Sequence, residues 1–290
     1  MKIAYLILAH NNYNHLKRLV LALNDSNVAF FIQIDTTLKI PNNLNEFENV
    51  VFVRGPKVSW AGWSTVEAIV SLLRTATSYG FDYYFFLSGG DYPIRPNSFL
   101  YSQLSTGGEF MNIKKGFYGD KSEKRFKYYY FDGFNRRNTR SVKTVFFYLI
   151  EGTMKLFFQK KSYPFKQIYV GSTWWGLSHN CILYILHFID HNEEYKKYKR
   201  FFKTSWAPDE SFFQTIIGNS PFYSTCKTNL TYQDWSTNPA PAWINKNHVE
   251  LFKKQTKFNV GYGNFWAFFA RKFNDESLEI VELIEKELRK

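Results

Sequence analysis

Ile3-Ala4-Tyr5-Leu6-Ile7-Leu8-Ala9 is a nearly continuous apolar run, and it passes through His10 into the polar pair Asn11-Asn12. An apolar run of this length is typical of a strand that is buried on both faces of a sheet. Across residues 11–24 the apolar side chains then recur at helical spacing, at Leu16, Leu19, Val20 and Leu23. The start of the chain therefore predicts a buried strand, a loop and a helix.

The next part of the chain repeats this alternation of strands and helices. Strands are predicted at 28–35, 50–54 and 83–87, and a helix at 64–79. The alternation predicts an α/β fold with a mostly parallel sheet flanked by helices on both faces, in which ligands collect at the carboxyl ends of the strands. Those ends carry His10, Asp35 and Ser88-Gly89-Gly90-Asp91.

The whole chain, 1–290, is expected to form one continuous domain with an inserted segment. Residues 107–166 are predicted to be an insertion over the sheet, with an apolar helix near 145–158. They differ from the rest of the chain by a high density of Lys and Arg and by the run Tyr128-Tyr129-Tyr130-Phe131. Beyond the insertion we expect one or two strands at 168–177, helices at 180–190 and 208–217, irregular backbone over 227–273 and an amphipathic helix over 275–290.

The composition narrows the class of partner without naming one. Aromatic residues make up 20% of the chain, and such rings serve as core filler or as flat faces for bases and sugars. The net charge is +12, from 37 Lys and Arg against 25 Asp and Glu. This excess favours nucleic acid, a phosphate-bearing ligand or an acidic membrane surface as the partner, and all three remain open at this point.

The cysteines and the N-terminus bear on the compartment. Cys181 and Cys226 form no Cys-x-x-Cys pair, so neither a disulfide framework nor a thiolate metal site is indicated. No cleavage site follows the N-terminal apolar run, and no apolar run reaches the roughly 18 residues that span a bilayer. We expect a cytoplasmic protein, bound at most peripherally at the inner face of an acidic membrane.

Pro208-Asp209-Glu210 has two interpretations. Proline in a first turn and acidic residues beside it are ordinary features of a helix N-terminus, where the macrodipole stabilises negative charge. The same placement keeps a carboxylate ionised, as a general base must be to take a proton from an attacking hydroxyl. Helix punctuation is the stronger interpretation on propensity alone. In the functional interpretation, Asp209 caps the helix and Glu210 faces the cleft.

Two other stretches could contact a ligand. Ser88-Gly89-Gly90-Asp91 follows a buried strand, and its paired glycines form a plain turn or let the backbone approach a bulky ligand. Ser59-Trp60-Ala61-Gly62-Trp63-Ser64 precedes a helix, and Ser64 with Glu67 matches a capping box. Trp63 is expected in the core, whereas Trp60 and Trp235 are each either core residues or platforms for a base or a sugar.

No metal site is indicated by the sequence. Asp-x-Asp occurs nowhere in the chain, and the six histidines show no His-x-x-x-His or His-Glu-x-x-His spacing. Neither Gly-x-Gly-x-x-Gly nor a Walker lysine motif occurs. A diphosphate ligand would therefore need cations to neutralise it, and Arg271-Lys272 offers two adjacent ones. A solvated pair of charges is the ordinary alternative for this dipeptide.

Seven short segments, taken together and in order, resemble glycosyltransferase family 14, which contains the core-2 and I-branching β-1,6-N-acetylglucosaminyltransferases and the peptide O-xylosyltransferases. Each segment is individually weak, but together they span nearly the whole chain. They are Ala4-Tyr5-Leu6-Ile7-Leu8-Ala9-His10, Ile34-Asp35, Trp60-Ala61-Gly62-Trp63-Ser64, Leu87-Ser88-Gly89-Gly90-Asp91-Tyr92-Pro93-Ile94-Arg95, Val170-Gly171-Ser172-Thr173-Trp174-Trp175, Pro208-Asp209-Glu210-Ser211-Phe212-Phe213 and Phe268-Phe269-Ala270-Arg271-Lys272-Phe273.

The resemblance implies a GT-A-type nucleotide-sugar-binding fold and inverting transfer from a UDP-sugar to a glycan hydroxyl, with no metal and no cofactor. It implies a nucleotide-binding half at about 1–106, an acceptor-side insertion at about 107–166, and a catalytic and diphosphate-binding part at about 167–290. Glu210 is then the base, and Asp209 becomes a cap or a supporting residue. The implied contacts are Leu8, His10, Asp35, Trp60, Ser88, Arg271 and Lys272 for the nucleotide and diphosphate, and Asp91, Arg125, Trp174 and Trp235 for the acceptor.

The donor, the acceptor and one basic contact stay open. N-acetylglucosamine is the favoured sugar and xylose the alternative, because 210–213 and 268–273 look closer to the xylosyltransferase branch. The family has a further basic residue, an arginine, whose place in this chain falls near 242–246 without a clear match. Lys246, Lys253 or Lys254 could substitute for it. A bacterial polysaccharide or a lipid-linked glycan is the expected acceptor, and no nucleic-acid partner is expected. The alternative of another class is a non-catalytic basic module that binds nucleic acid or membrane.

Overall fold

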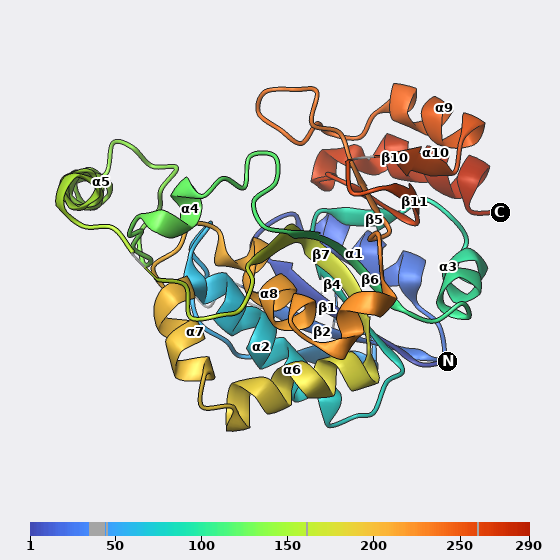
Figure 1. Ribbon diagram of the computed structural model, residues 1–290. Helices are drawn as coiled ribbons and strands as arrows, with labels where there is room; N and C mark the ends of the chain where they lie inside the picture. The colour runs from blue at the N-terminus through green and yellow to red at the C-terminus, as the bar shows by residue number, and fades with distance from the viewer. Residues whose placement is uncertain (35–43, 45, 161, 260) are drawn as a thin grey trace.

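A seven-stranded sheet forms the centre of the molecule (Figure 1). The computed structural model describes residues 1–290 except 35–43, 45, 161 and 260. The strand order in the sheet is β3-β2-β1-β4-β7-β6-β8. These strands are β1 Ile3–Ala9, β2 Val28–Ile34, β3 Val50–Phe52, β4 Tyr83–Ser88, β6 Glu109–Lys115, β7 Tyr169–Ser178 and β8 Cys226–Lys227.

The parallel half of the sheet is the half that the sequence predicted most clearly. β1 lies between β2 and β4 and is parallel to both, with Leu8 opposite Gln33 on one side and Ser88 on the other. β3 continues this half in parallel, whereas β7 is antiparallel to both β4 and β6. The predicted fold class, a mostly parallel α/β sheet of the GT-A type, is confirmed.

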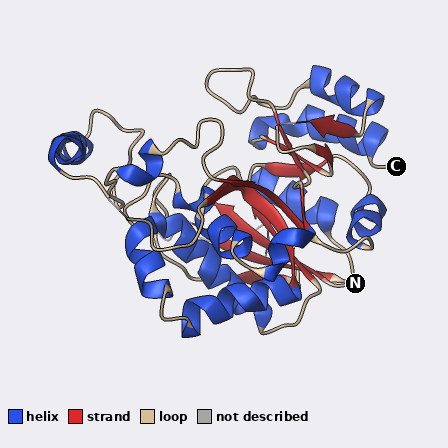
Figure 2. Cartoon of the chain, viewed as in Figure 1, coloured by secondary structure: helices blue, strands red, loops and turns tan. Residues whose placement is uncertain are grey.

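Helices cover both faces of the sheet, and each face has its own hydrophobic core (Figure 2). Over one face lie α1 Tyr13–Leu23, α3 Asn97–Leu104, α9 Lys246–Lys254 and α10 Leu278–Leu288. Over the other lie α2 Trp63–Thr77, α6 His179–His191, α7 Tyr195–Phe202 and α8 Phe212–Gly218. Across the described part of the chain, no helix combines the length and apolarity needed to cross a membrane.

A smaller three-stranded sheet, in the order β5-β12-β9, brings distant segments together. Its strands are β5 Asp91–Pro93, β9 Thr231–Gln233 and β12 Phe269–Arg271. β5 and β12 are antiparallel, and their register places Asp91 directly opposite Arg271. A separate antiparallel pair consists of β10 Lys257–Asn259 and β11 Asn264–Trp266. The loop after β4 is thereby joined to the C-terminal part of the chain.

β7 carries a bulge where it pairs with β6. Met111 lies opposite Trp175 and Ile113 lies opposite Gly171. An advance of two residues along β6 is therefore matched by an advance of four residues along β7. The extra residues lie within 172–174. Bulges re-aim side chains and are frequent beside active sites, so this part of β7 is where functional side chains are expected to gather.

The shape of the bulge is fixed by close packing and by hydrogen bonds. A Cβ atom at position 171 would lie 1.7 Å from the backbone oxygen of Asn112, so only Gly171 fits there. The Gln214 amide, on α8, donates to the Ser172 backbone oxygen at 2.7 Å. The Trp174 backbone oxygen accepts from the Asn229 amide at 3.2 Å. Residues 172–174 are therefore held from two sides.

The inserted segment begins later than predicted. Residues 109–115 form β6 within the central sheet, so the insertion outside the sheet comprises about 116–168 rather than 107–166. It carries α4 Lys124–Lys127 and α5 Val142–Phe157, and Figure 1 shows α5 standing apart from the rest of the chain. The sequence did not reveal β6 because its few apolar residues alternate poorly with polar ones before the basic stretch begins.

Two predicted elements differ in the structure. The helix expected at 208–217 is broken into a 3₁₀ helix, η2 Pro208–Glu210, and α8, because Ser211 between them adopts φ −150°. The region 227–273 is more regular than predicted, since it contains β9, α9 and β10 to β12. The Asn245 side chain caps α9 by accepting from the backbone N–H groups of Asn247 and His248.

The capping box expected at Ser64 and Glu67 does not form. Ser64 lies inside α2, and its backbone N–H donates at 2.7 Å to the carboxylate of Asp132, which belongs to the insertion. Glu67 instead accepts from the Trp63 indole at 2.8 Å. Gly62 leaves room for the Asp132 carboxylate, since a Cβ atom at position 62 would lie 2.2 Å from Asp132 Oδ1. Trp63 is buried in the core, as predicted.

His15 is a buried titratable group in the first turn of α1. Its ring stacks on Phe273 with centroids 5.5 Å apart, and its Nε2 lies 3.1 Å from the backbone oxygen of Asp91. Burial lowers the pKa of His15 to about 4, and the charge of Arg18 acts in the same direction. The folded protein therefore holds His15 neutral under conditions in which the unfolded chain would protonate it.

We expect the free energy of unfolding to fall as the pH falls from about 6.5, the ordinary pKa of histidine, toward 4. In that range the unfolded state binds more protons at this position than the folded state does. The contribution should be on the order of 3 kcal/mol, measured by urea unfolding at several pH values. His15→Gln should remove it, whereas His187→Gln, at an exposed site on α6, should keep the wild-type slope. An unaltered slope in His15→Gln would contradict this assignment.

Candidate active site

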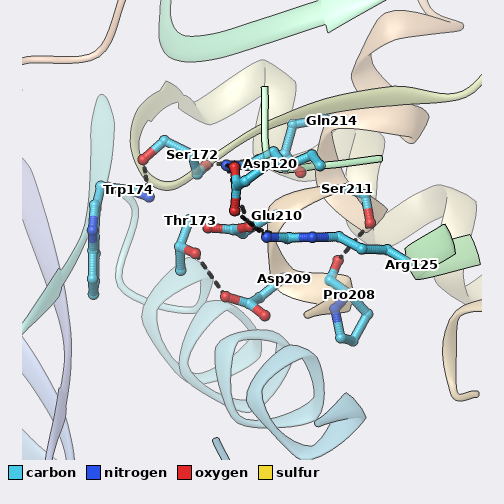
Figure 3. A network of polar contacts seen from close by, with 11 residues as sticks. Asp120, Arg125, Ser172, Thr173, Trp174, Pro208, Asp209, Glu210, Ser211 and Gln214 are labelled. Carbon is cyan, nitrogen blue, oxygen red and sulfur yellow. Dashed lines mark hydrogen bonds and ion pairs between the residues drawn. The ribbon is translucent and has the colours of Figure 1, made fainter. Parts of the chain in front are cut away.

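Glu210, the predicted base, lies in η2 between α7 and α8, and Figure 3 shows the Arg125 guanidinium pointing toward it. Its Oε2 lies 2.6 Å from Arg125 Nη1 and 3.4 Å from Lys121 Nζ. Asp120 pairs with both of these cations. The Glu210 side chain keeps 24% of its surface exposed, so its carboxylate is fixed in position but can still be reached by a ligand.

Arg125 therefore has a different role from the predicted one. Its guanidinium is engaged by the carboxylates of Glu210 and Asp120, and its backbone oxygen accepts from the Trp206 N–H at 3.0 Å. These contacts direct the charge of Arg125 at Glu210 and Asp120 rather than at the predicted acceptor. Lys121, which the sequence did not single out, shares this role.

Asp209, the neighbour of Glu210 in η2, contacts the bulge in β7 and does not cap a helix. Its carboxylate accepts from the Thr173 hydroxyl at 2.6 Å, and η2 has no side-chain cap. Burial and then the charge of Glu210 raise the pKa of Asp209 to about 6, while the Thr173 hydrogen bond opposes this shift. Of the two roles expected for Asp209, a cap or a supporting residue, the contact with Thr173 in the bulge of β7 fits the second.

Arg271 lies on the other side of the same bulge. Its Nη1 is 3.4 Å from Asp91 Oδ1, and its guanidinium lies 4.1 Å from the centre of the Trp174 ring. Burial lowers the pKa of Arg271, whereas the charge of Asp91 raises it. Trp174 in turn stacks on Phe86 of β4, with centroids 5.4 Å apart. Trp174, a predicted acceptor contact, thus serves as the platform for Arg271.

Asp91 does not reach the acceptor, and that prediction is corrected. The residue is fully buried, and its Oδ2 accepts from the Ser88 N–H at 2.6 Å while Oδ1 faces Arg271. Burial raises the pKa of Asp91, and the charge of Arg271 opposes this shift. Asp91 therefore fixes the loop after β4 against β12. The sequence could not indicate this because it depends on a pairing across 180 residues.

Lys272 is the cation best placed to receive an anion. Its Nζ lies over the Trp243 ring, 4.5 Å from the ring centre. Burial lowers the pKa of Lys272, and the charges of Arg271 and Arg137 lower it further. Among the described residues no carboxylate forms an ion pair with Lys272. A cation surrounded by cations gains most from an anionic ligand.

Arg137, from the insertion, is the basic neighbour that sequence reasoning missed. Its guanidinium lies 4.9 Å from the centre of the Trp60 ring. Two of the three lysines considered for this place are engaged elsewhere: Lys246 pairs with Glu279, and Lys253 pairs with carboxylates of Glu250 and Glu287. The third, Lys254, is exposed on α9. The only signal in the sequence was the high density of Lys and Arg around position 137, which does not distinguish one cation from another.

Three of the other predicted nucleotide contacts, Leu8, His10 and Ser88, lie at the carboxyl ends of parallel strands. Leu8 and Ser88 are adjacent across β1 and β4, and exposed His10 follows β1 directly. Trp60 is 52% exposed and meets the edge of Trp206 at 5.5 Å, close to the segment that carries Glu210. Asp35 lies outside the described residues. The structure thus brings Leu8 and Ser88 together at the carboxyl ends of β1 and β4, whereas Trp60 lies nearer the segment that carries Glu210.

Trp235 lies in an exposed loop rather than in the core. It is 63% exposed, and the loop is closed by the hydrogen bond from the Ala242 N–H to the Asp234 oxygen at 2.8 Å. The Lys272 N–H in turn donates to the Ala242 oxygen at 3.3 Å. Trp235 is therefore not a core residue, and its contact with the acceptor stays a prediction. Within the described ranges no group of three or more His, Cys, Asp or Glu could hold a metal ion.

Asp91→Asn should destabilise the protein by about 3–5 kcal/mol, because Arg271 would remain largely buried without its counter-charge. The amide can still accept from the Ser88 N–H, so the change isolates the charge. Urea unfolding measures this cost. Asp190→Asn, which breaks the more exposed pair with Arg74, is the matched control and should cost at most about 1 kcal/mol. Equal costs at the two sites would contradict the importance of the buried pair.

Comparisons with known proteins bear on the whole of this site. The family model described as "Core-2/I-Branching enzyme" matches residues 3–257. The chain is 26% identical to xylosyltransferase 2 of Canis lupus familiaris over 314 residues, covering 97% of the chain and 33% of that relative. The same values hold for xylosyltransferase 2 of Homo sapiens over 317 residues.

Xylosyltransferase 1 of Mus musculus is 24% identical over 304 residues, covering 94% of the chain and 29% of the relative. The chain thus spans about a third of the length of the curated relatives it matches. The family model, in contrast, covers most of the chain, and the resemblance seen in the sequence is confirmed: the chain belongs to the core-2/I-branching enzyme family.

Proposed function

We propose that the chain is an inverting glycosyltransferase that moves a sugar from a UDP-sugar to a glycan hydroxyl, with Glu210 as its general base. One observation carries this proposal. The consecutive residues Thr173 and Trp174 of β7 contact Asp209, next to Glu210, and Arg271, next to Lys272. A carboxylate and a pair of cations are thereby held at one bulge, as a single displacement requires.

In the proposed reaction the Glu210 carboxylate acts on the acceptor and the cations act on the leaving group. The acceptor oxygen attacks the anomeric carbon as Glu210 takes the hydroxyl proton, and the bond to the diphosphate breaks on the opposite face. Both cation contacts of Glu210 are made to Oε2, so we assign the proton to Oε1. Lys272, with Arg271 and Arg137, stabilises the negative charge that develops on the departing diphosphate.

We further propose that the transfer needs no metal ion. The support comes from the residues themselves: the chain contains no Asp-x-Asp, and the charges of Arg271 and Arg137 act on Lys272 strongly enough to lower its pKa. Lys272 and Arg137 each lie over an indole ring, which holds the charged groups in place. These cations can supply electrostatically what a divalent ion supplies in Asp-x-Asp enzymes.

The donor sugar is the finer part of the proposal. Because these relatives are named xylosyltransferases, we rank UDP-xylose above UDP-N-acetylglucosamine as the donor, although the sequence alone favoured N-acetylglucosamine. Thermal unfolding with a panel of UDP-sugars separates the two, because a ligand that binds only the folded state raises the melting temperature. A shift with oligonucleotides but none with any UDP-sugar would favour the non-catalytic basic module instead.

Glu210→Gln should lower kcat by about 100-fold or more, the usual share of a general base, and should leave UDP binding unchanged. The change keeps the shape of the side chain but removes its capacity to accept the proton. Sugar transfer and UDP-induced thermal shifts measure the two quantities separately. Glu282→Gln, at an exposed position on α10, is the matched control and should behave as wild type. Wild-type turnover in Glu210→Gln would exclude this residue as the base.

Lys272→Gln should weaken UDP binding by about tenfold, because a charge-assisted contact with the diphosphate is lost. Lys197→Gln, on the exposed surface of α7, should leave the affinity unchanged. Titration calorimetry with UDP measures both, and the same titration in excess EDTA should give the wild-type affinity. An affinity that disappears with EDTA and returns with manganese would contradict the cationic diphosphate site.

A further inference from the structure

α5 is the helix of the insertion that packs least against the rest of the chain. Figure 1 shows it at the far side of the insertion, beyond α4 and separated from the central sheet. The helix comprises 16 residues, and only Thr144 and Glu151 are buried. With a rise of about 1.5 Å per residue it presents a surface roughly 24 Å long. Its outer face is therefore a feature that the proposed catalytic role does not use.

The side of α5 that faces the protein is its polar side. Glu151 is buried against Arg136 in an ion pair, with both side chains 2% exposed. The Thr144 hydroxyl donates to the Asn135 oxygen at 3.0 Å, and the Tyr148 hydroxyl donates to the Arg136 oxygen at 2.9 Å. Rolling the helix to bury a different face would separate the Glu151–Arg136 pair, so the orientation of α5 is fixed.

The side of α5 that faces outward is apolar. At 100° per residue, positions 142, 145, 146, 149, 153, 156 and 157 fall on the face opposite Glu151. Six of these seven are large apolar residues, and all six are exposed: Val142, Val145, Phe146, Leu149, Leu156 and Phe157. Leu156 and Phe157 are 79% and 73% exposed. The usual pattern of a surface helix is thus reversed, and an apolar face of this kind marks an interaction surface.

The charge around this face is strongly positive. Residues 133–166 contain eight Lys and Arg but a single acidic residue, Glu151. Arg136 pairs with Glu151, and Lys160 donates to the Phe201 and Thr204 oxygens, so the remaining cations are the ones that can border the outer face. Arg140 and Lys143 are exposed beside the N-terminal end of α5, and Lys155 lies in its last turn. An apolar face bordered by cations is complementary to a bilayer that carries acidic headgroups.

We propose that α5 is an interfacial membrane-binding helix, which lies in the plane of an anionic phospholipid bilayer with Phe146, Leu149 and Leu156 among the acyl chains. The surrounding cations then contact the headgroups. A second copy of the chain fits this face less well, since a twofold contact would bring two strongly basic segments against each other. The proposal rests on α5 alone and does not depend on the role of Glu210.

The test is flotation of the full chain with vesicles of phosphatidylcholine alone and of equal parts phosphatidylcholine and phosphatidylglycerol. Wild type should float with the anionic vesicles, and high salt should weaken this binding. Leu149→Ser with Leu156→Ser should lower the partition coefficient by about tenfold or more. Leu21→Ser with Leu183→Ser, at exposed positions of α1 and α6, is the matched control and should bind as wild type.

Circular dichroism and melting temperature should be unchanged in both double variants, because all four leucines are exposed. Failure of wild type to float, or equal binding by the α5 double variant, would overturn the proposal. So would a dimer in sedimentation equilibrium that dissociates on Leu149→Ser with Leu156→Ser, since α5 would then serve a second copy. Loss of flotation without any loss of sugar transfer to a soluble acceptor would separate this surface from the catalytic site.

Discussion

The bulge in β7 is the constraint on which the candidate site depends. It turns Thr173 toward Asp209 and Trp174 toward Arg271, and Gly171 allows it because nothing larger fits against the Asn112 backbone. Because Thr173 and Trp174 are consecutive, one short stretch of β7 holds both the segment that carries Glu210 and the segment that carries Lys272.

The charges on the two sides of the bulge are kept in separate groups. Glu210 has its own cations, Arg125 and Lys121, both from the insertion. Arg271 has its own carboxylate, Asp91, from the loop after β4. This division leaves Lys272 without a carboxylate partner among the described residues and therefore able to meet an anionic ligand. Because the insertion supplies the ion-pair partners of Glu210, it is part of the candidate site and not only a cover over the sheet.

The sequence predicted the parts of this arrangement that depend on local pattern. The buried strand at 3–9, the helices that follow it and the parallel half of the sheet come from apolar periodicity, which short-range physics dictates. The roles predicted for Glu210 and Lys272 were inferred from short segments that resemble the family in the same order along the chain. The partners of these residues could not be predicted in this way. Asp132 reaches Ser64 across 68 residues, and Arg125 reaches Glu210 across 85, so only the folded chain brings them together.

The same limit explains the residues that were assigned the wrong role. Asp91 and Arg125 stand in segments that match the family, but their side chains are engaged by charges on distant strands and turns. The most direct measurement is a crystal structure of the chain with an intact UDP-sugar. We predict that the anomeric carbon faces the Glu210 carboxylate while the diphosphate contacts Lys272. A sugar whose anomeric carbon points away from Glu210, or a diphosphate held by a divalent ion instead of Lys272, would contradict this mechanism.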